Sequence, residues 1–228
     1  MFKRKKYGIS RKKTTRPWAG IGVGLSAPAA PGKIRRPVQR RAGQSLVVET
    51  MRKIANFFGL QIGWFACALG AANSMPLIGP AVVTIHLAIH FIWSDDRKRE
   101  AAFLLFTTLL GILIDSAQKA AGFIVYASAW PPVDWLAPIW IVAMWLLFAT
   151  TFSTSLSWLQ GRYAIASLMG AIFGPLSYVA GERLGAIAFA QPLLQTVFIF
   201  GLIWAIVMPA LAWFAKQLRR TDLADANL

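Results

Sequence analysis

Asp115 and Lys119 are charged side chains inside an otherwise apolar stretch of the chain, and their spacing allows two kinds of chemistry. Positions i and i+4 lie on one face of a helix, and an acid that precedes a base is the favourable order for an ion pair. One interpretation is a self-neutralised pair near a membrane interface, with the lysine extending outward. The other places Asp115 in the bundle interior as a partner for a proton or a polar headgroup, because ionisable groups inside membrane spans are costly and often functional.

His86 and His90, the two histidines of the chain, also stand four residues apart. This spacing can ligate a metal ion, with Asp95 or Asp96 as a third ligand about one turn further on. A di-iron site of the kind found in membrane desaturases needs many more histidines. We therefore predict inward-facing histidines held by hydrogen bonds, and neither a metal nor another cofactor.

A Gly-Pro step near residue 175 marks the best candidate for a polar pocket. Pro175 removes one helical hydrogen bond and kinks a helix. Carbonyl groups freed at membrane depth must face protein or a wet cavity. Tyr178, Glu182 and Arg183 follow closely in the sequence, so we predict that they line a pocket that opens outward.

Recognisable catalytic groupings are not found in the sequence. It contains no Ser/His/Asp set, no glycine-rich phosphate loop after a strand and no paired carboxylates. The single cysteine, Cys67, permits neither a disulfide nor a thiolate zinc site. We predict a protein without catalytic activity, and a membrane-embedded enzyme that uses the histidines is the alternative.

Six apolar runs must position these side chains, and they cover residues 54–72, 77–93, 101–120, 139–156, 163–180 and 193–215. A helix needs about 20 mostly apolar residues to cross a bilayer, with about 17 as a lower limit. In lipid, each run must satisfy its own backbone hydrogen bonds. The sequence therefore predicts an all-α membrane protein with a six-helix transmembrane bundle. The third helix is expected to end near Ala120, before an interfacial segment that extends through Pro132.

Charges in the loops predict the orientation, because short cytoplasmic loops carry an excess of Lys and Arg. Basic residues precede the first run, occur within 94–100 and at Arg162, and follow the last run. The loops 73–76, 121–138 and 181–192 carry no net positive charge. Tryptophans, which favour the headgroup level, fall near the ends of several runs on both sides. We predict a multi-pass protein of the bacterial inner membrane with both termini in the cytoplasm.

The N-terminal segment carries most of the positive charge, with 15 of the 24 Lys and Arg in residues 1–53 against one acid. Gly and Pro interrupt it too often for a helix or a secretory signal. We predict a disordered arm over 1–50 that contacts anionic lipid, and no nucleic-acid binding, since aromatic interleaving is lacking. The alternative is translation from Met51. The transmembrane domain is assigned to 51–220 and a short tail to 221–228.

Small residues recur four positions apart, a spacing that lets helix backbones approach closely in lipid. We interpret these pairs as packing within the chain, and a homodimer seam or another membrane-protein partner is the alternative. The pairs are Gly59 and Gly63, Gly170 and Gly174, and Gly181 and Gly185.

Three of these segments together resemble a known family. They are the run 63–72, the Gly111-x-x-x-Asp115 step and the Gly174-Pro175-x-x-Tyr178-x-x-Gly181 turn. They resemble a family of small bacterial inner-membrane proteins catalogued as a domain of unknown function, over residues 51–220. Its members typically begin at a methionine like Met51 and are often encoded beside cyclopropane-fatty-acid-synthase-like enzymes. The resemblance implies a link to membrane lipid modification and carries no catalytic residue with it.

Two functional hypotheses follow. The first is an accessory or binding component in membrane lipid metabolism or envelope maintenance. The second is a small transporter or permease in which Asp115 is the coupling residue. Transporters often contain internal repeats with interrupted helices, and no convincing repeat is visible in this sequence, which favours the first hypothesis.

Overall fold

The computed structural model describes the backbone of residues 35–225 and the side chains of residues 46–219. This part contains α1 (Arg35–Ala72), α2 (Ile78–Trp93), α3 (Arg97–Ala120), β1 (Ile124–Tyr126), α4 (Ile139–Ala149), the 3-10 turn η1 (Ser157–Leu159), α5 (Tyr163–Arg183), β2 (Ile187–Phe189) and α6 (Leu193–Asp225). The chain divides into two units, Met1–Arg40 and Arg41–Leu228, and the packing described below is that of the second. The prediction of six helices is confirmed for the described residues.

The helix ends agree with the sequence at some positions and differ at others. The helix α3 ends at Ala120, as predicted, and begins at Arg97, where the Asp96 side chain accepts a hydrogen bond from the Arg99 backbone N–H at 3.0 Å. The helix α1 begins at Arg35, well before the predicted start at residue 54. Residues 1–34 of the predicted arm and the last three residues of the predicted tail lie outside the described part of the chain.

The fourth run does not form one long helix, so the span predicted over residues 139–156 is corrected. The helix α4 ends at Ala149, and turns and η1 follow it. At this point the hydroxyls of Thr150 and Thr151 donate to the backbone carbonyls of Leu147 and Phe148, at 2.7 and 2.6 Å. Such local hydrogen bonds compete with the helical ladder, and they account for the early end of α4.

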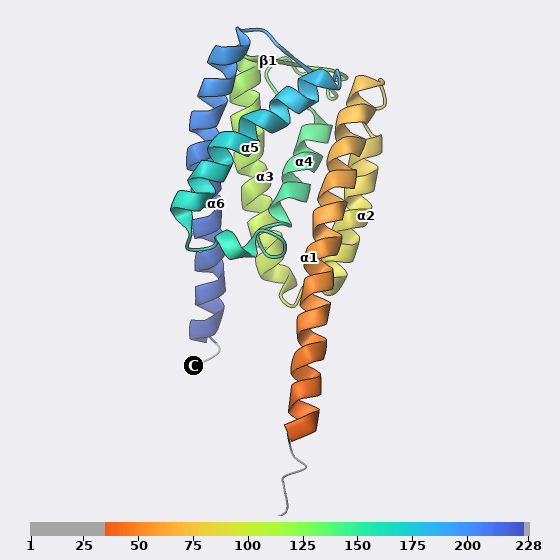
Figure 1. Cartoon of the computed structure of the whole chain (residues 1–228). Helices are drawn as coiled ribbons and strands as arrows, with labels where there is room; N and C mark the ends of the chain where they lie inside the picture. Colours follow the sequence, from red (N-terminus) through yellow and green to blue (C-terminus); the bar gives the residue numbers. More distant parts are fainter. Residues whose placement is uncertain (1–34, 226–228) are drawn as a thin grey trace, which may run out of the picture. The chain divides into compact units, whose positions relative to one another are not determined.

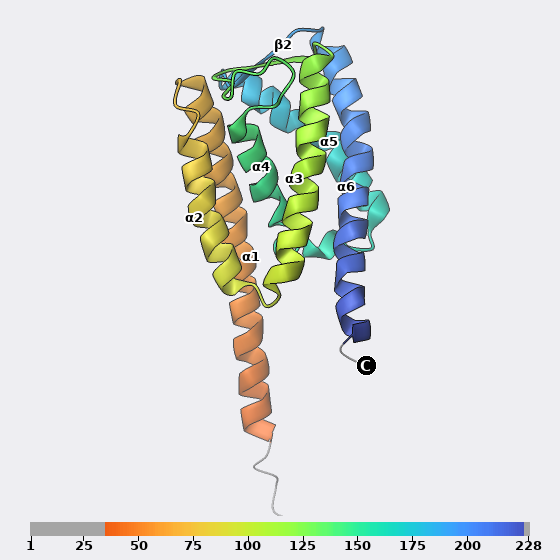
Figure 2. The same ribbon diagram turned by 180° about the vertical axis from the view of Figure 1, so that it is seen from behind.

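Successive helices alternate in direction, so that the loops fall alternately at two ends of the bundle (Figure 1). The helix α4 lies between α3 and the α1–α2 pair in this view and in the view from behind (Figure 2). None of its residues is exposed. The helices α5 and α6 pack closely, because Gly170 lies against the backbone of Trp204, where a Cβ would come within 2.2 Å of the carbonyl oxygen. This pair of glycines, Gly170 and Gly174, therefore serves packing within the chain.

A short antiparallel ladder joins the α3–α4 and α5–α6 connections. Its register pairs Ile124 with Phe189 and Tyr126 with Ile187. Ile124 and Tyr126 are buried, whereas Val125 between them is exposed, as alternation along a strand requires. The sequence analysis did not predict this ladder, which holds Tyr126 over the end of the bundle.

Four helical segments are long and apolar enough to cross a membrane: Leu46–Ala72, Arg97–Ala120, Tyr163–Arg183 and Leu193–Arg219. The helices α2 and α4 are apolar but shorter. Large apolar side chains are exposed on the long helices, among them Phe58, Leu113, Phe173 and Ile206. Such a surface suits lipid rather than water, and these helices suggest a multi-pass membrane protein.

Candidate functional site

The carboxyl group of Asp115 is the centre of a buried polar cluster. The side chain is 1% exposed. The hydroxyls of Tyr126 and Tyr178 donate to its Oδ1 at 2.6 and 2.9 Å, and the indole Nε1 of Trp145 donates to its Oδ2 at 2.5 Å. Four elements (α3, β1, α4 and α5) therefore meet at one carboxyl group.

Gly111 allows Trp145 to reach this carboxyl group. A Cβ at position 111 would stand 2.0 Å from Cδ2 of the Trp145 ring, so only a glycine leaves room for the indole one turn before Asp115. Gly174 likewise leaves room for the Trp204 side chain of α6, because a Cβ there would stand 2.2 Å from Cγ of Trp204. The rings of Trp145 and Trp204 then stack in parallel, with 5.3 Å between their centroids and 5° between their planes.

The tyrosines are fixed by the ladder and by α6. The β1 strand carries Tyr126, whose ring meets Trp140 edge-on at 5.7 Å. The ring of Tyr178 meets Phe200 of α6 at 4.7 Å. Burial, together with the neighbouring carboxyl group of Asp115, raises the pKa of Tyr126 well above its ordinary value. Its hydroxyl therefore stays protonated and remains a hydrogen-bond donor to Asp115.

A cavity of about 480 Å³ adjoins Asp115. Its walls come from α1, α4, α5 and α6, and they are almost entirely apolar or aromatic. Among its lining residues that the structure describes, Asp115 is the only Asp, Glu, Lys, Arg or His. Phe65 of α1 and Phe173 and Leu176 of α5 also line it, and all three are exposed. The cavity therefore reaches the apolar outer surface between α1 and α5.

Lys119 does not pair with Asp115, although the sequence spacing favoured an ion pair as one interpretation. Its ammonium group donates instead to the backbone carbonyls of Val133 and Leu136, at 2.8 and 3.0 Å. The side chain is half-buried against the α3–α4 connection. Asp115 faces the bundle interior, as the other interpretation proposed, with neutral donors around it.

Glu182 and Arg183, which the sequence grouped with Tyr178, lie elsewhere. Both stand at the end of α5, where Glu182 is half-buried and Arg183 exposed. Neither lines the cavity at Asp115, whereas Tyr178 does. The structure thus joins Tyr178 to Asp115 and leaves the two charged residues outside that cluster.

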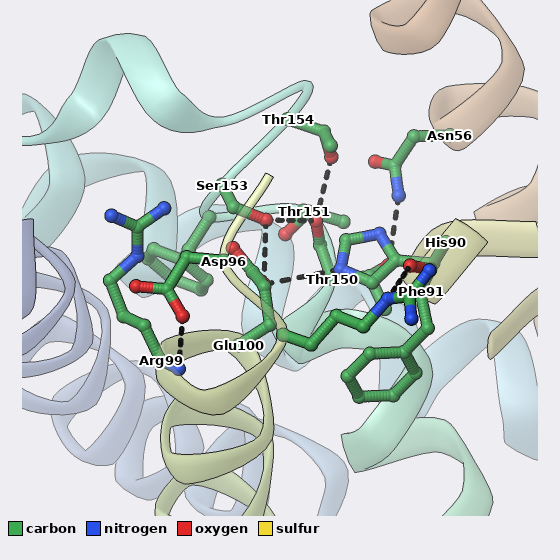
Figure 3. Close-up of polar contacts among 12 residues, drawn as sticks. Asn56, His90, Phe91, Asp96, Arg99, Glu100, Thr150, Thr151, Ser153 and Thr154 are labelled. Carbon is green, nitrogen blue, oxygen red and sulfur yellow. Dashed lines mark hydrogen bonds and ion pairs between the residues drawn. The ribbon is translucent and has the colours of Figure 1, made fainter. Parts of the chain in front are cut away.

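His90 belongs to a second polar cluster, at the α2–α3 end of the bundle (Figure 3). Its Nε2 lies 3.1 Å from Oε2 of Glu100, and both side chains are buried. The hydroxyl of Ser153, just beyond α4, donates to the same oxygen at 3.0 Å. One carboxylate oxygen thus contacts a buried histidine and a half-buried serine on different elements.

His86 contacts a different group of partners. Its Nε2 lies 3.2 Å from the hydroxyl oxygen of Thr150 and 3.5 Å from the amide nitrogen of Asn56. Asn56 also donates to Thr150 at 2.8 Å and accepts from Ser155 at 2.7 Å. Both histidines are therefore hydrogen-bonded, as the sequence predicted, and each through its own set of partners.

The second cluster forms one wall of a cavity of about 900 Å³. Charged side chains surround this cavity, including Arg52, Lys53, Asp95 and Arg219. Arg52 pairs with Asp95 at 3.4 Å and Lys53 with Glu49 at 2.6 Å. Over the described residues, no three His, Cys, Asp or Glu side chains are grouped so that they could hold a metal ion.

Several residues of these clusters were not singled out in the sequence. Glu100 counted as a loop charge, although its place in the first turn of α3 puts it opposite the end of α2. Asn56 is one of two polar amide residues in the apolar run 54–72, with Gln61, and such residues are themselves a signal in a membrane helix. Tyr126 and Trp145 resemble any other aromatic residue of the chain, and no local pattern distinguishes them.

Residues 53–210 match a family described as a protein of unknown function (DUF2878). The matched region contains both polar clusters and nearly all residues that line the two cavities. No curated protein matches the chain, and no solved structure does.

Proposed function

The chain belongs to the DUF2878 family of proteins of unknown function, and we propose that it binds an amphipathic molecule from the bilayer in the cavity at Asp115. The observation that carries this proposal is the combination of an apolar cavity, an opening at the apolar outer surface and one polar cluster at its wall. Ligand pockets typically enclose about 300–1,000 Å³ and place a few polar groups among apolar walls. The cavity fits that description.

Each part of the cavity matches a part of such a ligand. The apolar lining excludes a strongly hydrated solute, because stripping polar groups of water without new hydrogen bonds is costly. The Asp115 cluster offers hydrogen-bonding partners to a polar group at one end. The exposed position of Phe173 and Leu176 gives a molecule dissolved in lipid a direct route inward.

The role that fits this binding site is a non-catalytic component of membrane lipid metabolism or envelope maintenance in a bacterial inner membrane. The hydroxyl groups of the second cluster already have fixed hydrogen-bond partners. The Thr150 hydroxyl donates to the Leu147 carbonyl, so it accepts from its other neighbours, and the Ser153 hydroxyl donates to Glu100. Hydroxyl groups held in this way stabilise structure, and this arrangement supports binding over catalysis.

A transporter is the second candidate, and one observation favours it. The two cavities have adjacent residues of α1 on their walls, Gly59 in one and Leu60 in the other. The two cavities therefore lie on neighbouring sides of the same helix. Flux through proteoliposomes that depends on Asp115 would support a transporter, and binding without flux would support the first candidate.

Met169→Trp is expected to reduce ligand binding by about tenfold or more, because overpacking a cavity costs about 1–3 kcal/mol and about 1.4 kcal/mol is tenfold in affinity. Met169 lines the cavity and is half-buried. The measurement is labelling of the membrane-embedded protein by a neutral fatty alcohol that carries a photoactivatable diazirine, followed by mapping of the labelled peptides.

Leu168→Trp is the matched control, since Leu168 is the preceding residue of α5, is 62% exposed and does not line the cavity. It should keep the labelling of the unchanged protein. Equal labelling of the two variants would show that the probe reacts from the lipid-facing surface, and would contradict the proposal.

A further inference from the structure

Over the side chains that the structure describes, the Asp115 carboxyl group has no positively charged hydrogen-bond partner. Its three hydrogen-bond donors, Tyr126, Trp145 and Tyr178, are all neutral. The nearest basic residue along α3, Lys119, is engaged by two backbone carbonyls of the α3–α4 connection. Among the described residues that line the cavity, none carries a positive charge.

The donors around Asp115 suit the ionised form of its carboxyl group. An ionised carboxylate accepts about four hydrogen bonds and donates none, and here three of those positions are occupied by donors. An ionised carboxylate in a dry interior is costly unless a positive charge accompanies it. The donors are thus placed to stabilise a negative charge on Asp115, and a cationic ligand would supply the countercharge that the ionised form needs.

The walls around Asp115 suit an organic cation. Trp145 and Trp204 stack on each other beside the carboxyl group, so the ring faces left for a ligand are those of the other aromatic residues that line the cavity, among them Trp140, Phe148 and Tyr178. Aromatic rings attract a cation over their faces within about 6 Å, most strongly when it is an ammonium group shielded from water. The same rings supply the apolar contact that the rest of the ligand needs.

We infer that the cavity takes a lipophilic organic cation, an ammonium group on an apolar body, with the charge against Asp115 and the body against the aromatic walls. This inference rests on the proposed function and names its ligand class. A bare metal ion does not fit, because hard cations such as Ca²⁺ take about 6–8 oxygen ligands. Among the described residues that line the cavity, the non-aromatic side chains with an oxygen atom are Asp115, Gln61 and Ser177, and the one phenol is that of Tyr178, which already donates to Asp115. They are too few for such an ion.

The test compares two probes of the same shape and opposite charge. The full chain in a neutral maltoside detergent is dialysed to equilibrium against tetraphenylphosphonium or tetraphenylborate. We expect saturable binding of the cation, and binding of the anion that is weaker by about tenfold or more. This comparison uses the unchanged protein, so it stands even where a variant fails to fold.

Asp115→Asn removes the charge and keeps the size of the side chain. It should weaken binding of tetraphenylphosphonium by about tenfold or more, and Leu168→Trp should leave it unchanged. Equal affinity for the two ions, or an unchanged affinity in Asp115→Asn, overturns the cation assignment. If Met169→Trp still reduces labelling by the fatty alcohol, the proposed function stands although the cation assignment fails. If Met169→Trp reduces neither the labelling by the fatty alcohol nor the binding of the cation, both the proposed function and the cation assignment are overturned.

Discussion

Glu100→Ala is expected to lower the free energy of unfolding by about 1–3 kcal/mol, because the buried imidazole of His90 loses its partner and an unsatisfied buried group costs about that much. Nε2 of His90 lies 3.1 Å from Oε2 of Glu100. The half-buried hydroxyl of Ser153 donates to the same oxygen at 3.0 Å, but it keeps the Thr150 carbonyl as a second acceptor at 3.3 Å. Unfolding by sodium dodecyl sulfate in mixed micelles, followed by circular dichroism, measures the change.

Two control variants define the cause of this loss. Glu100→Gln keeps an oxygen acceptor at the same place and should be destabilised less than Glu100→Ala. Asp95→Ala removes the acid of the Arg52–Asp95 ion pair. The Asp95 side chain is 88% exposed. Such a surface pair contributes about 0–1 kcal/mol. A loss in Glu100→Ala no larger than in Asp95→Ala would show that the buried cluster does not support the fold.

An alkaline-phosphatase reporter is expected to be inactive after Leu228 and active when inserted after Asp134, an all-or-none contrast. Basic residues gather at the end of the bundle that holds the α2–α3 loop and the C-terminal part of α6, among them Arg97, Lys98 and Lys216. The β1–β2 ladder lies at the opposite end (Figure 1), where the connections carry no comparable excess. Lys and Arg mark cytoplasmic loops, so six spans with cytoplasmic termini are expected.

The reporter after Asp134 separates six spans from four. If only the four long segments crossed the bilayer, α1 and α3 would be consecutive spans, and the loop after α3 would return to the cytoplasm. An inactive reporter at Asp134 would then be observed. Activity at the C-terminus would reverse the orientation altogether. Insertion of the same reporter after Lys98, in the first turn of α3, should give no activity with six spans and activity with four, so it is a second test of the same alternative.

Local patterns in the sequence were sufficient for the helices and insufficient for their contacts. The apolar runs predicted six helices and the end of α3, since apolar length and flanking charges are properties of neighbouring residues. The end of α4 at Ala149 was not predicted. It depends on whether Thr150 and Thr151 bond to the preceding turn, a choice that local propensity leaves open.

The candidate site shows the same division. Asp115 and Tyr178 were each singled out as polar residues in apolar surroundings. Their contact at 2.9 Å joins α3 to α5, and the spacing of residues in the sequence does not predict it. The i,i+4 spacing placed Lys119 on the face of Asp115, and the carbonyls of Val133 and Leu136 engage the ammonium group instead. Competition between a local and a distant partner is decided by tertiary structure.

The short central helix has a consequence for the surrounding bilayer. In a six-span arrangement, the 11 residues of α4 rise about 16 Å and the 16 residues of α2 about 24 Å, whereas the hydrocarbon layer is about 30 Å thick. Hydrophobic mismatch acts only where a helix meets acyl chains. No residue of α4 is exposed, but Ile85, Ile89 and Ile92 of α2 are. The short length of α4 is thus compensated inside the protein, and any mismatch with the acyl chains falls on the α2 side.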